Sequence, residues 1–223
     1  MSARLVRPWL ELDLGTPHRV LSWAVHRPGL VEARHILWRE VRNADLPPGL
    51  DVTGWLADEV TARGRGDAVT MLTSRNLDRF EQAQARVDGV TAHCVATVGL
   101  SNAERIGTRV DRSGTDWGTI NVALVLSQPL TDAALIETVS IVAQARTTAI
   151  IGTGLMLPTG CATGTGTDCI AVAAPAGDMP YAGLHTAAGE ATGRAVLDAI
   201  GTAARVWMER DRRPAGAGPT RRG

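Results

Sequence analysis

The first forty residues alternate between apolar and polar side chains. Residues 5–14 and 18–26 place apolar positions two apart, on either side of Gly15-Thr16-Pro17. This pattern predicts two antiparallel strands that are joined at that turn and have one buried face. Residues 34–42 repeat the alternation and predict a third strand, and Pro47-Pro48-Gly49 then interrupts the pattern.

The rest of the chain mixes helical and strand patterns. Asp51 is a candidate N-cap for a helix to about residue 63, and we expect a second helix over residues 78–87. Apolar residues at three- and four-residue steps predict two longer helices, over 131–151 and 186–210. Strands are expected at 69–73, 90–98, 120–127 and 169–174. Hairpins followed by strand–helix–strand units favour an α/β (α+β) class, with a single mixed β-sheet covered by helices.

Length and composition exclude several classes of protein. The 223 residues predict one domain over residues 1–210 and a disordered tail over 211–223, which is rich in Pro, Gly and Arg. Lys+Arg and Asp+Glu both number 23, so no net charge favours a nucleic acid or an anionic membrane as partner. The chain has no lysine, which excludes a Walker-type phosphate lysine and a Schiff-base lysine.

Targeting signals and cysteine usage indicate a compartment. No apolar run reaches the roughly 18 residues of a membrane span, and the N-terminus lacks the apolar stretch of a signal peptide. Cys94, Cys161 and Cys169 form no CxxC pair. We therefore expect a cytoplasmic protein without a zinc cluster.

The stretch from Pro158 to Ala174 holds the densest candidate chemistry. Thr163, Thr165 and Thr167 alternate with Gly164 and Gly166, and the loop closes on Asp168 before an apolar strand. Glycines let a backbone approach a ligand closely, and free N–H groups beside hydroxyls can hold an anion or an oxyanion. The alternative is a polar turn that leads into a buried strand. Gly164-Thr165-Gly166 is too short for a dinucleotide motif, which would also require a helix next.

Two further segments carry candidate catalytic groups. Gly99-Leu-Ser101-Asn102-Ala103 is close to the G-x-S-x-G nucleophile elbow of the α/β-hydrolases. Asp168 and His185 come later in the chain, which gives the order Ser, Asp, His that is found in that fold. A polar, glycine-broken segment comes next where the elbow needs a helix, so Ser101 and Asn102 are better interpreted as a pair that lines a pocket. His185 precedes the last helix, with Glu190 one turn further on, and is a candidate general acid or base.

The alternative for His185 is a local hydrogen bond at the start of that helix. The other four histidines lie singly, so we expect no metal. Trp9, Trp23 and Trp38 fall in the first three expected strands, where they either join the core or form a flat aromatic wall for a planar ligand. Trp117 precedes Gly118-Thr119 and is the leading aromatic candidate for ligand contact.

Five motifs come in a characteristic order: ATVGLSNA at 96–103, GTINV at 118–122, LTDAALIE at 130–137, ATGTGTD at 162–168 and YAGLHTAAGE at 181–190. Together they resemble the adenosylcobinamide amidohydrolase family, over about residues 5–208. The resemblance implies hydrolysis of the amide between aminopropanol and the corrin propionate, which gives adenosylcobyric acid for salvage into cobalamin. The positions that it marks are Ser101, Asn102, Asn121, Thr163, Thr165, Thr167, Asp168, His185, Thr186 and Glu190.

These residues suit that chemistry. Ser, Asn and Thr side chains can bind the neutral amides that fringe a corrin ring. We expect Asp168, His185, Thr165 and Thr167 to be catalytic, with Asp168 either orienting His185 or binding water. We expect Ser101, Asn102, Asn121, Thr163, Gly164, Gly166, Trp117 and Glu190 to bind substrate. Attack by water and attack by a Thr or Ser nucleophile both stay open.

No cofactor is expected, and the expected partner is a small corrinoid, with a homodimer left open. Three alternatives to the amidohydrolase are a corrinoid-binding module without catalysis, an amidase for another substrate, and a nucleotide- or phosphate-binding enzyme. The last is disfavoured by the missing lysine and by the strand that follows the glycine loop.

Overall fold

The computed structural model describes residues 1–111 and 118–212. Eight strands form one mixed sheet in the order β4-β3-β2-β12-β8-β6-β5, with β1 paired to β2. The expected fold class is confirmed. The elements are β1 (Ser2–Val6), β2 (Trp9–Ser22), β3 (Gly29–Glu40), η1 (Asn43–Asp45), α1 (Val52–Ala62), β4 (Val69–Thr73), η2 (Leu77–Arg79), β5 (Glu81–Val87), β6 (Val90–Val98), β7 (Ala103–Glu104), β8 (Ile120–Leu126), α2 (Asp132–Ile151), β9 (Met156–Leu157), β10 (Gly160–Cys161), β11 (Gly164–Thr165), β12 (Cys169–Ala174) and α3 (Ala187–Arg210).

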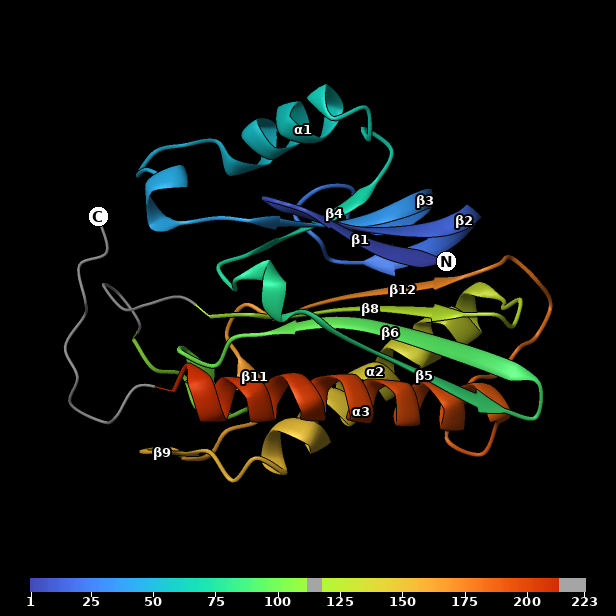
Figure 1. The fold of residues 1–223 in the computed structure, drawn as a ribbon. Coiled ribbons are helices and arrows are strands. Elements are labelled where there is room, and N and C mark those ends of the chain that lie inside the picture. Colours follow the sequence, from blue (N-terminus) through green and yellow to red (C-terminus); the bar gives the residue numbers. More distant parts are fainter. Residues whose placement is uncertain (112–117, 213–223) are drawn as a thin grey trace.

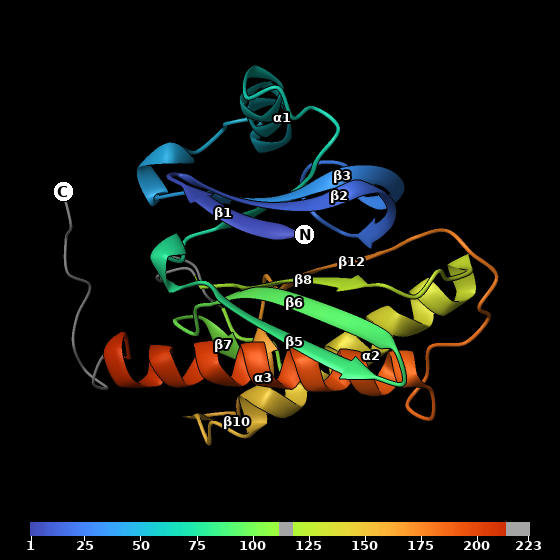
Figure 2. The same ribbon diagram turned by 45° about the vertical axis from the view of Figure 1, so that its right-hand side comes forward.

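The sheet folds back on itself, so the molecule has four layers. Figures 1 and 2 show α1 over β1–β4, these strands over β12, β8, β6 and β5, and the helices α2 and α3 on the far side. The fold-back occurs along β2. β3 pairs with both halves of β2, whereas β1 pairs with its first half and β12 with its second half. Both faces of the central strands are therefore covered.

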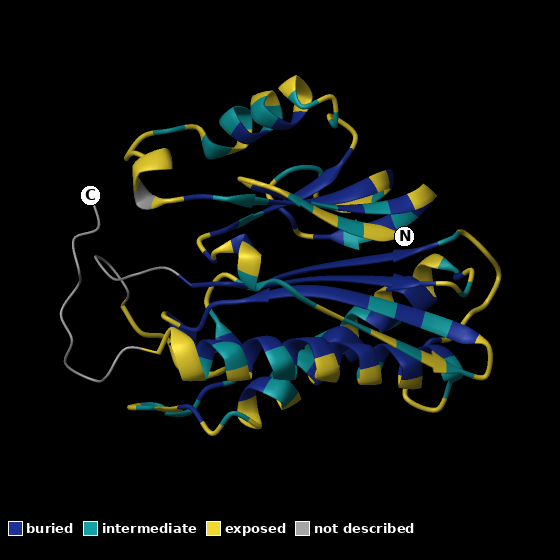
Figure 3. Ribbon diagram, in the orientation of Figure 1, coloured by how far each residue is buried: buried dark blue, intermediate teal, exposed yellow. Residues whose placement is uncertain are grey.

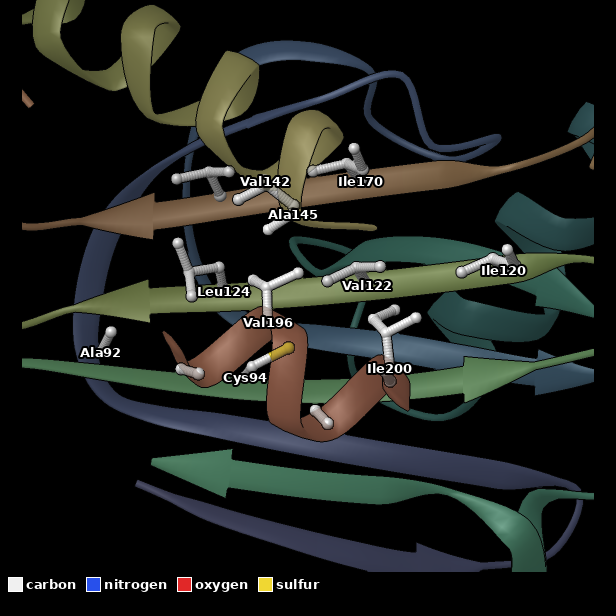
Figure 4. Close-up of a cluster of buried hydrophobic side chains, with 14 of the residues drawn as sticks. Ala92, Cys94, Ile120, Val122, Leu124, Val142, Ala145, Ile170, Val196 and Ile200 are labelled. Atoms are coloured by element: carbon white, nitrogen blue, oxygen red, sulfur yellow. The ribbon is translucent and has the colours of Figure 1, made fainter. Parts of the chain in front are cut away.

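β12 is apolar at every position, and β8 is apolar at every position except Asn121, because both faces of these strands are buried. Along β12, Ile170 and Val172 point to the core beneath α2 and α3, whereas Ala171 and Ala173 point to the core beneath β2 and β3. Figure 3 shows β8 and β12 buried along their length. Figure 4 shows Val142 and Ala145 of α2 beside β12, and Val196 and Ile200 of α3 beside β8 and β6, on the same face of the sheet.

Helix α2 is long and apolar enough to cross a membrane by length and composition, with a mean hydropathy of 1.3 over its best window. Its side chains pack instead against α3 and the sheet, with Leu135, Val142 and Ile150 buried. Core helices of this kind often have such a composition.

The expected hairpin at Gly15-Thr16-Pro17 is wrong. β2 runs through these residues, and its register against β3 shifts between Asp13 and His18, which makes a bulge. The Asp13 Oδ1 atom accepts a hydrogen bond from Gly15 N at 2.8 Å, and Gly15 has a φ of 84°. The same local chemistry serves a turn or a bulge, and only the long partner strand β3 decides between them.

The expected helix over residues 78–87 is also wrong. A short 3₁₀ turn precedes β5, whose alternating half-buried and exposed residues pair antiparallel with β6. Asp88 and Gly89 connect the two strands with φ values of 45° and 86°. Two residues with positive φ are typical of a type I′ hairpin, and Asp-Gly between alternating segments is its sequence signal.

The other predicted elements are present. Asp51 and Thr131 cap α1 and α2, with their side chains accepting from Gly54 N and Ala134 N. The third strand covers Gly29–Glu40 rather than 34–42. Of the predicted tail, Asp211 pairs with Arg75 at 2.8 Å, and residues 213–223 lie outside the described part of the chain.

Candidate active site

Asp168 is the centre of the candidate site. It stands immediately before β12, where the glycine–threonine loop ends, and its side chain is only 6% exposed. Its Oδ1 atom accepts hydrogen bonds from the Thr165 hydroxyl and from Ile120 N, the latter at 3.1 Å. Its Oδ2 atom accepts from Thr165 N at 3.0 Å and lies 3.1 Å from the Arg146 guanidinium. All four partners are donors, so the site accommodates the ionised carboxylate.

Burial raises the pKa of Asp168 above its ordinary value, because the charged form loses water. The positive charge of Arg146 and the hydrogen bonds from Thr165 and Ile120 act in the opposite direction but do not cancel the effect of burial. A raised pKa at a carboxylate in a cleft is a feature of acid–base sites as well as of structural ion pairs.

Gly164 makes room for this arrangement. A Cβ atom on Gly164 would lie 2.6 Å from Asp168 Oδ2 and 3.7 Å from the Arg146 guanidinium. Any larger residue would therefore push the carboxylate out of its position.

The threonines of the loop bind neighbouring segments. The Thr167 hydroxyl donates to the Gly118 carbonyl oxygen at 2.9 Å, and Thr119 Oγ1 donates to the Thr167 carbonyl oxygen at the same distance. Thr163 Oγ1 accepts from Ile106 N at 2.8 Å. β11 also pairs with β7, so the loop is held from both sides. Figure 1 places β11 at the end of the sheet where β12 begins.

Asn121 connects the two halves of the folded sheet. It is fully buried on β8, and its Nδ2 atom donates to the Leu72 carbonyl oxygen of β4 at 2.7 Å. Its Oδ1 atom accepts from the Thr119 hydroxyl at 3.1 Å. Asn121 thus fixes the wall of the site, and its amide is already occupied in this state.

Two pockets adjoin Asp168, and both are also lined by Thr167. The first, which we call the apolar pocket, has a volume of about 450 Å³ and lies between the two halves of the sheet. It is lined by Trp23, Val25, Val41, Arg42, Leu46, Met71, Leu72, Thr73, Ser74, Gly118, Thr119, Asn121, Thr167, Asp168 and Cys169.

The second, the arginine pocket, has a volume of about 440 Å³ and lies on the other side of the loop. It is lined by Asn102, Glu104, Arg105, Ile106, Gly107, Thr108, Arg109, Val110, Arg146, Thr147, Thr163, Gly164, Thr165, Gly166, Thr167 and Asp168. The loop that the sequence singles out is therefore the wall between two hollows.

The structure separates His185 from Asp168. Asp168 contacts Arg146 near the end of α2, whereas Ala182, three residues before His185, donates to Glu137 Oε2 near the start of α2. Nine residues of helix, about 13 Å, separate Glu137 from Arg146. Figure 1 shows the loop from β12 to α3 at the opposite end of the sheet from β11. The expected meeting of His185 with Asp168 is wrong.

His185 and its neighbours occupy an exposed helix start. His185 is exposed, and Thr186 caps α3 by accepting from Gly189 N at 3.0 Å. Glu190 is exposed and forms an ion pair with Arg194 one turn along. Neither pocket includes these three residues. The structure thus places them away from the cluster of expected site residues.

The serine elbow is absent. Ser101 is exposed, and the short strand β7 follows it where an elbow would need a helix. Asn102 is 3% exposed and lines the arginine pocket. Trp117 lies outside the described residues.

Two residues of the candidate site, Trp23 and Arg146, do not stand out in the sequence as site residues. Trp23 is half exposed at the apolar pocket, and its Nε1 atom donates to the Asp168 carbonyl oxygen at 2.8 Å. Trp9 and Trp38 are core residues, as expected for most strand tryptophans. The sequence feature that could have identified Trp23 is its position. It comes directly after the last residue of β2, where the alternation of buried and exposed residues ends.

Arg146 could have been identified from its position in α2. It follows Val142 by four residues and so falls on the buried face of α2. A guanidinium on such a face needs an anionic partner, which in this chain is Asp168.

Comparison with known proteins gives the family. The model of the adenosylcobinamide amidohydrolase family matches residues 2–212. The chain belongs to this family. It is 31% identical over 162 residues to the adenosylcobinamide amidohydrolase of Halobacterium salinarum. That alignment covers 66% of this chain and 64% of the relative, so the chain spans less than two thirds of that protein's length.

Among solved structures, the PH0078 protein from Pyrococcus horikoshii OT3 is similar with a TM-score of 0.46 and 11% identity, over 87% of this chain and 76% of that chain. A likeness at this level says nothing of function. Within the described residues, no group of three or more His, Cys, Asp or Glu side chains is arranged to hold a metal ion.

Proposed function

We propose that the protein hydrolyses the amide between aminopropanol and the corrin propionate of adenosylcobinamide. Water adds to the amide carbon, the C–N bond breaks, and the products are adenosylcobyric acid, as its carboxylate, and protonated aminopropanol. The product can then re-enter cobalamin synthesis. Membership of the family supports the substrate class, and the position of Asp168 between two pockets supports the reaction.

The single observation that carries the mechanism is the buried Asp168 carboxylate with a raised pKa at the wall between the pockets. Ligand pockets have volumes of about 300–1,000 Å³, and a corrin with its fringe is too large to enter either hollow whole. The ring therefore lies outside, against the exposed face of Trp23, and the amide-bearing side chain reaches in towards Thr167 and Asp168.

Proton transfer runs through Asp168. Its lone pairs already accept from four donors, of which the Thr165 hydroxyl is the only neutral side-chain group. Asp168 can accept the proton of Thr165, or of a water that takes the place of this hydroxyl. The same proton can then pass to the departing amine nitrogen. A raised pKa makes both transfers easier, because the carboxyl group binds and releases the proton nearer to neutral pH.

Two routes of attack fit this geometry. In one, a water held by Asp168 attacks the amide carbon directly. In the other, Thr165 attacks and forms an ester that water then hydrolyses. Hydroxylamine added during turnover distinguishes them, because it traps an ester as a hydroxamate. We expect an intact polypeptide in both cases, and mass spectrometry that found a cut before Thr163, Thr165 or Thr167 would instead make the new N-terminal threonine the nucleophile.

The deciding experiment is incubation with adenosylcobinamide followed by chromatography for adenosylcobyric acid and aminopropanol. The matched variant is Asp168→Asn, which preserves the shape of the side chain. Equimolar appearance of both products with the parent protein, and a large loss with the variant, supports the proposal. Tight binding of adenosylcobinamide without products would instead identify a corrinoid-binding module that uses Trp23 and the polar loops.

We also propose that the protein works in the cytoplasm. Cys94, Cys161 and Cys169 are all free thiols, and burial raises the pKa of Cys169 to about 12, which keeps that thiol unreactive. Fractionation of cells, with blotting for the protein, tests this location.

A further inference from the structure

The arginine pocket holds more positive charge than amide hydrolysis of a neutral side chain requires. Arg105, Arg109 and Arg146 line it against the two carboxylates of Glu104 and Asp168. Asp168 is already paired with Arg146 at 3.1 Å. Over residues 1–111 and 118–212, neither Arg105 nor Arg109 forms an ion pair or a hydrogen bond through its side chain. Two guanidinium groups are thus available in one hollow.

The backbone makes room for Arg105. A Cβ atom on Gly160 would lie 2.7 Å from one terminal nitrogen of Arg105 and 3.1 Å from its Cδ atom. Gly160 has a φ of 114°, a conformation that other residues rarely adopt. The Arg105 side chain therefore packs directly across the β10 backbone, towards the pocket that it lines. This contact reduces the rotamer freedom that a surface arginine would lose on binding a ligand.

The remaining lining leaves room for an oxyanion. Thr163, Thr165 and Thr167, together with the small residues Gly164 and Gly166, line the same hollow. Arginine presents several N–H donors in a planar fork that fits carboxylate and phosphate groups, and such charge-assisted hydrogen bonds are the strong ones. We propose that the arginine pocket is an oxyanion-binding subsite, which takes a carboxylate or a phosphate ester through Arg105 and Arg109.

The two sources of such an oxyanion on the reaction path rest on the proposed function. One is the propionate carboxylate that hydrolysis releases beside Asp168. The other is a phosphoryl group esterified to the hydroxyl of the aminopropanol arm, beyond the amide. Both sources would present an oxyanion to the arginine pocket. A comparison of substrates with and without the phosphoryl group distinguishes between them.

Binding is measured first, without turnover. Inorganic phosphate, propionate and neutral propionamide are each titrated into the protein at constant ionic strength, with the melting temperature as the readout. We expect phosphate and propionate to raise the melting temperature and propionamide to leave it unchanged. Arg105 and Arg109 are both exposed. A double variant that carries Arg105→Gln and Arg109→Gln should raise the Kd for the two anions by about tenfold or more.

Arg86→Gln is the matched control, since Arg86 is an exposed arginine on β5 that lines neither pocket. Anion binding that is unchanged in the double variant, or absent from the parent protein, overturns the proposal. Binding that is retained by a protein without hydrolytic activity supports the subsite and refutes only the proposed function.

Kinetics then assign the source. If the phosphoryl group is the ligand, the double variant should have a lower kcat/KM for adenosylcobinamide phosphate and an unchanged kcat/KM for adenosylcobinamide. The product carboxylate is supported when both substrates keep their kcat/KM but inhibition by propionate weakens. An equal loss for both substrates, with unchanged inhibition by phosphate and propionate, overturns the oxyanion role of the two arginines.

Discussion

The indole Nε1 atom of Trp23 donates a hydrogen bond to the main-chain carbonyl oxygen of Asp168 over 2.8 Å. The bond joins the end of β2 to the start of β12, and it holds a half-exposed aromatic ring beside the residue that centres the site. A flat aromatic surface and a buried carboxylate are thus fixed to one another through a single peptide unit.

Asp168→Asn should lower kcat by roughly 10²–10⁴-fold, because the amide cannot accept the proton that the reaction releases. Circular dichroism should show that the variant keeps its fold. Thr165→Val tests the partner hydroxyl, and we expect a comparable loss if the proton passes through Thr165. A near-normal rate for Asp168→Asn would assign the carboxylate to loop structure alone.

The rate should fall at acid pH because Asp168 becomes protonated there. Burial raises its pKa, so the acid limb of kcat/KM should lie above the ordinary aspartate pKa of about 3.9. A pH–rate profile measures the limb. A limb at or below the ordinary value would contradict the assignment of Asp168 as the group that must be ionised.

The stability of the fold should respond to the same ionisation. With a folded pKa above the unfolded one, the folded state binds the proton more tightly, so the contribution of Asp168 is present below the unfolded pKa and is lost as pH rises through the folded pKa. The free energy of unfolding of the parent, minus that of Asp168→Asn, should therefore decrease as pH rises across this window. Urea denaturation at a series of pH values measures both, and an increase would reverse the sign of the shift.

Trp23→Ala should raise KM for adenosylcobinamide by about tenfold, since aromatic contact with a flat ligand typically contributes on the order of 1 kcal/mol or more. Trp23→Phe keeps the aromatic face but loses the bond to Asp168, so its KM should rise less. Trp55→Phe, on α1 away from both pockets, is the control. Equal KM values for Trp23→Ala and the parent would remove Trp23 from the binding surface.

His185→Ala should keep near-normal turnover, because His185 is exposed at the start of α3 and lies at the other end of the sheet from Asp168. The double variant with Asp168→Asn should be no worse than Asp168→Asn alone. Steady-state kinetics of the three proteins check this. A hundredfold loss in His185→Ala would place the reacting atoms at the opposite end of the sheet.

Dialysis against a strong chelator should leave the rate unchanged. The prediction rests on the donor set, since no three metal-ligating side chains come together in the described residues, and Asp168 already accepts from four donors. Loss of activity that zinc or another divalent ion restores would contradict it.

The sequence by itself determined the fold class, most of the elements and the central loop. Apolar runs such as residues 169–174 identify strands that are buried on both faces, and caps such as Thr131 and Thr186 mark where helices begin. The Gly164–Asp168 segment is recognisable because alternating glycines and threonines are rare inside regular elements. These signals are local, so one chain segment suffices to show them.

The tertiary structure alone decided which residues share a site. Asp168 and His185 flank one strand and its return loop, and only the direction of β12 and the packing of α3 set them at opposite ends of the sheet. Trp23 and Arg146 are 123 positions apart, yet both contact Asp168, because the sheet folds back along β2 and α2 crosses β12. Such proximity follows from long-range pairing and packing, which no local pattern encodes.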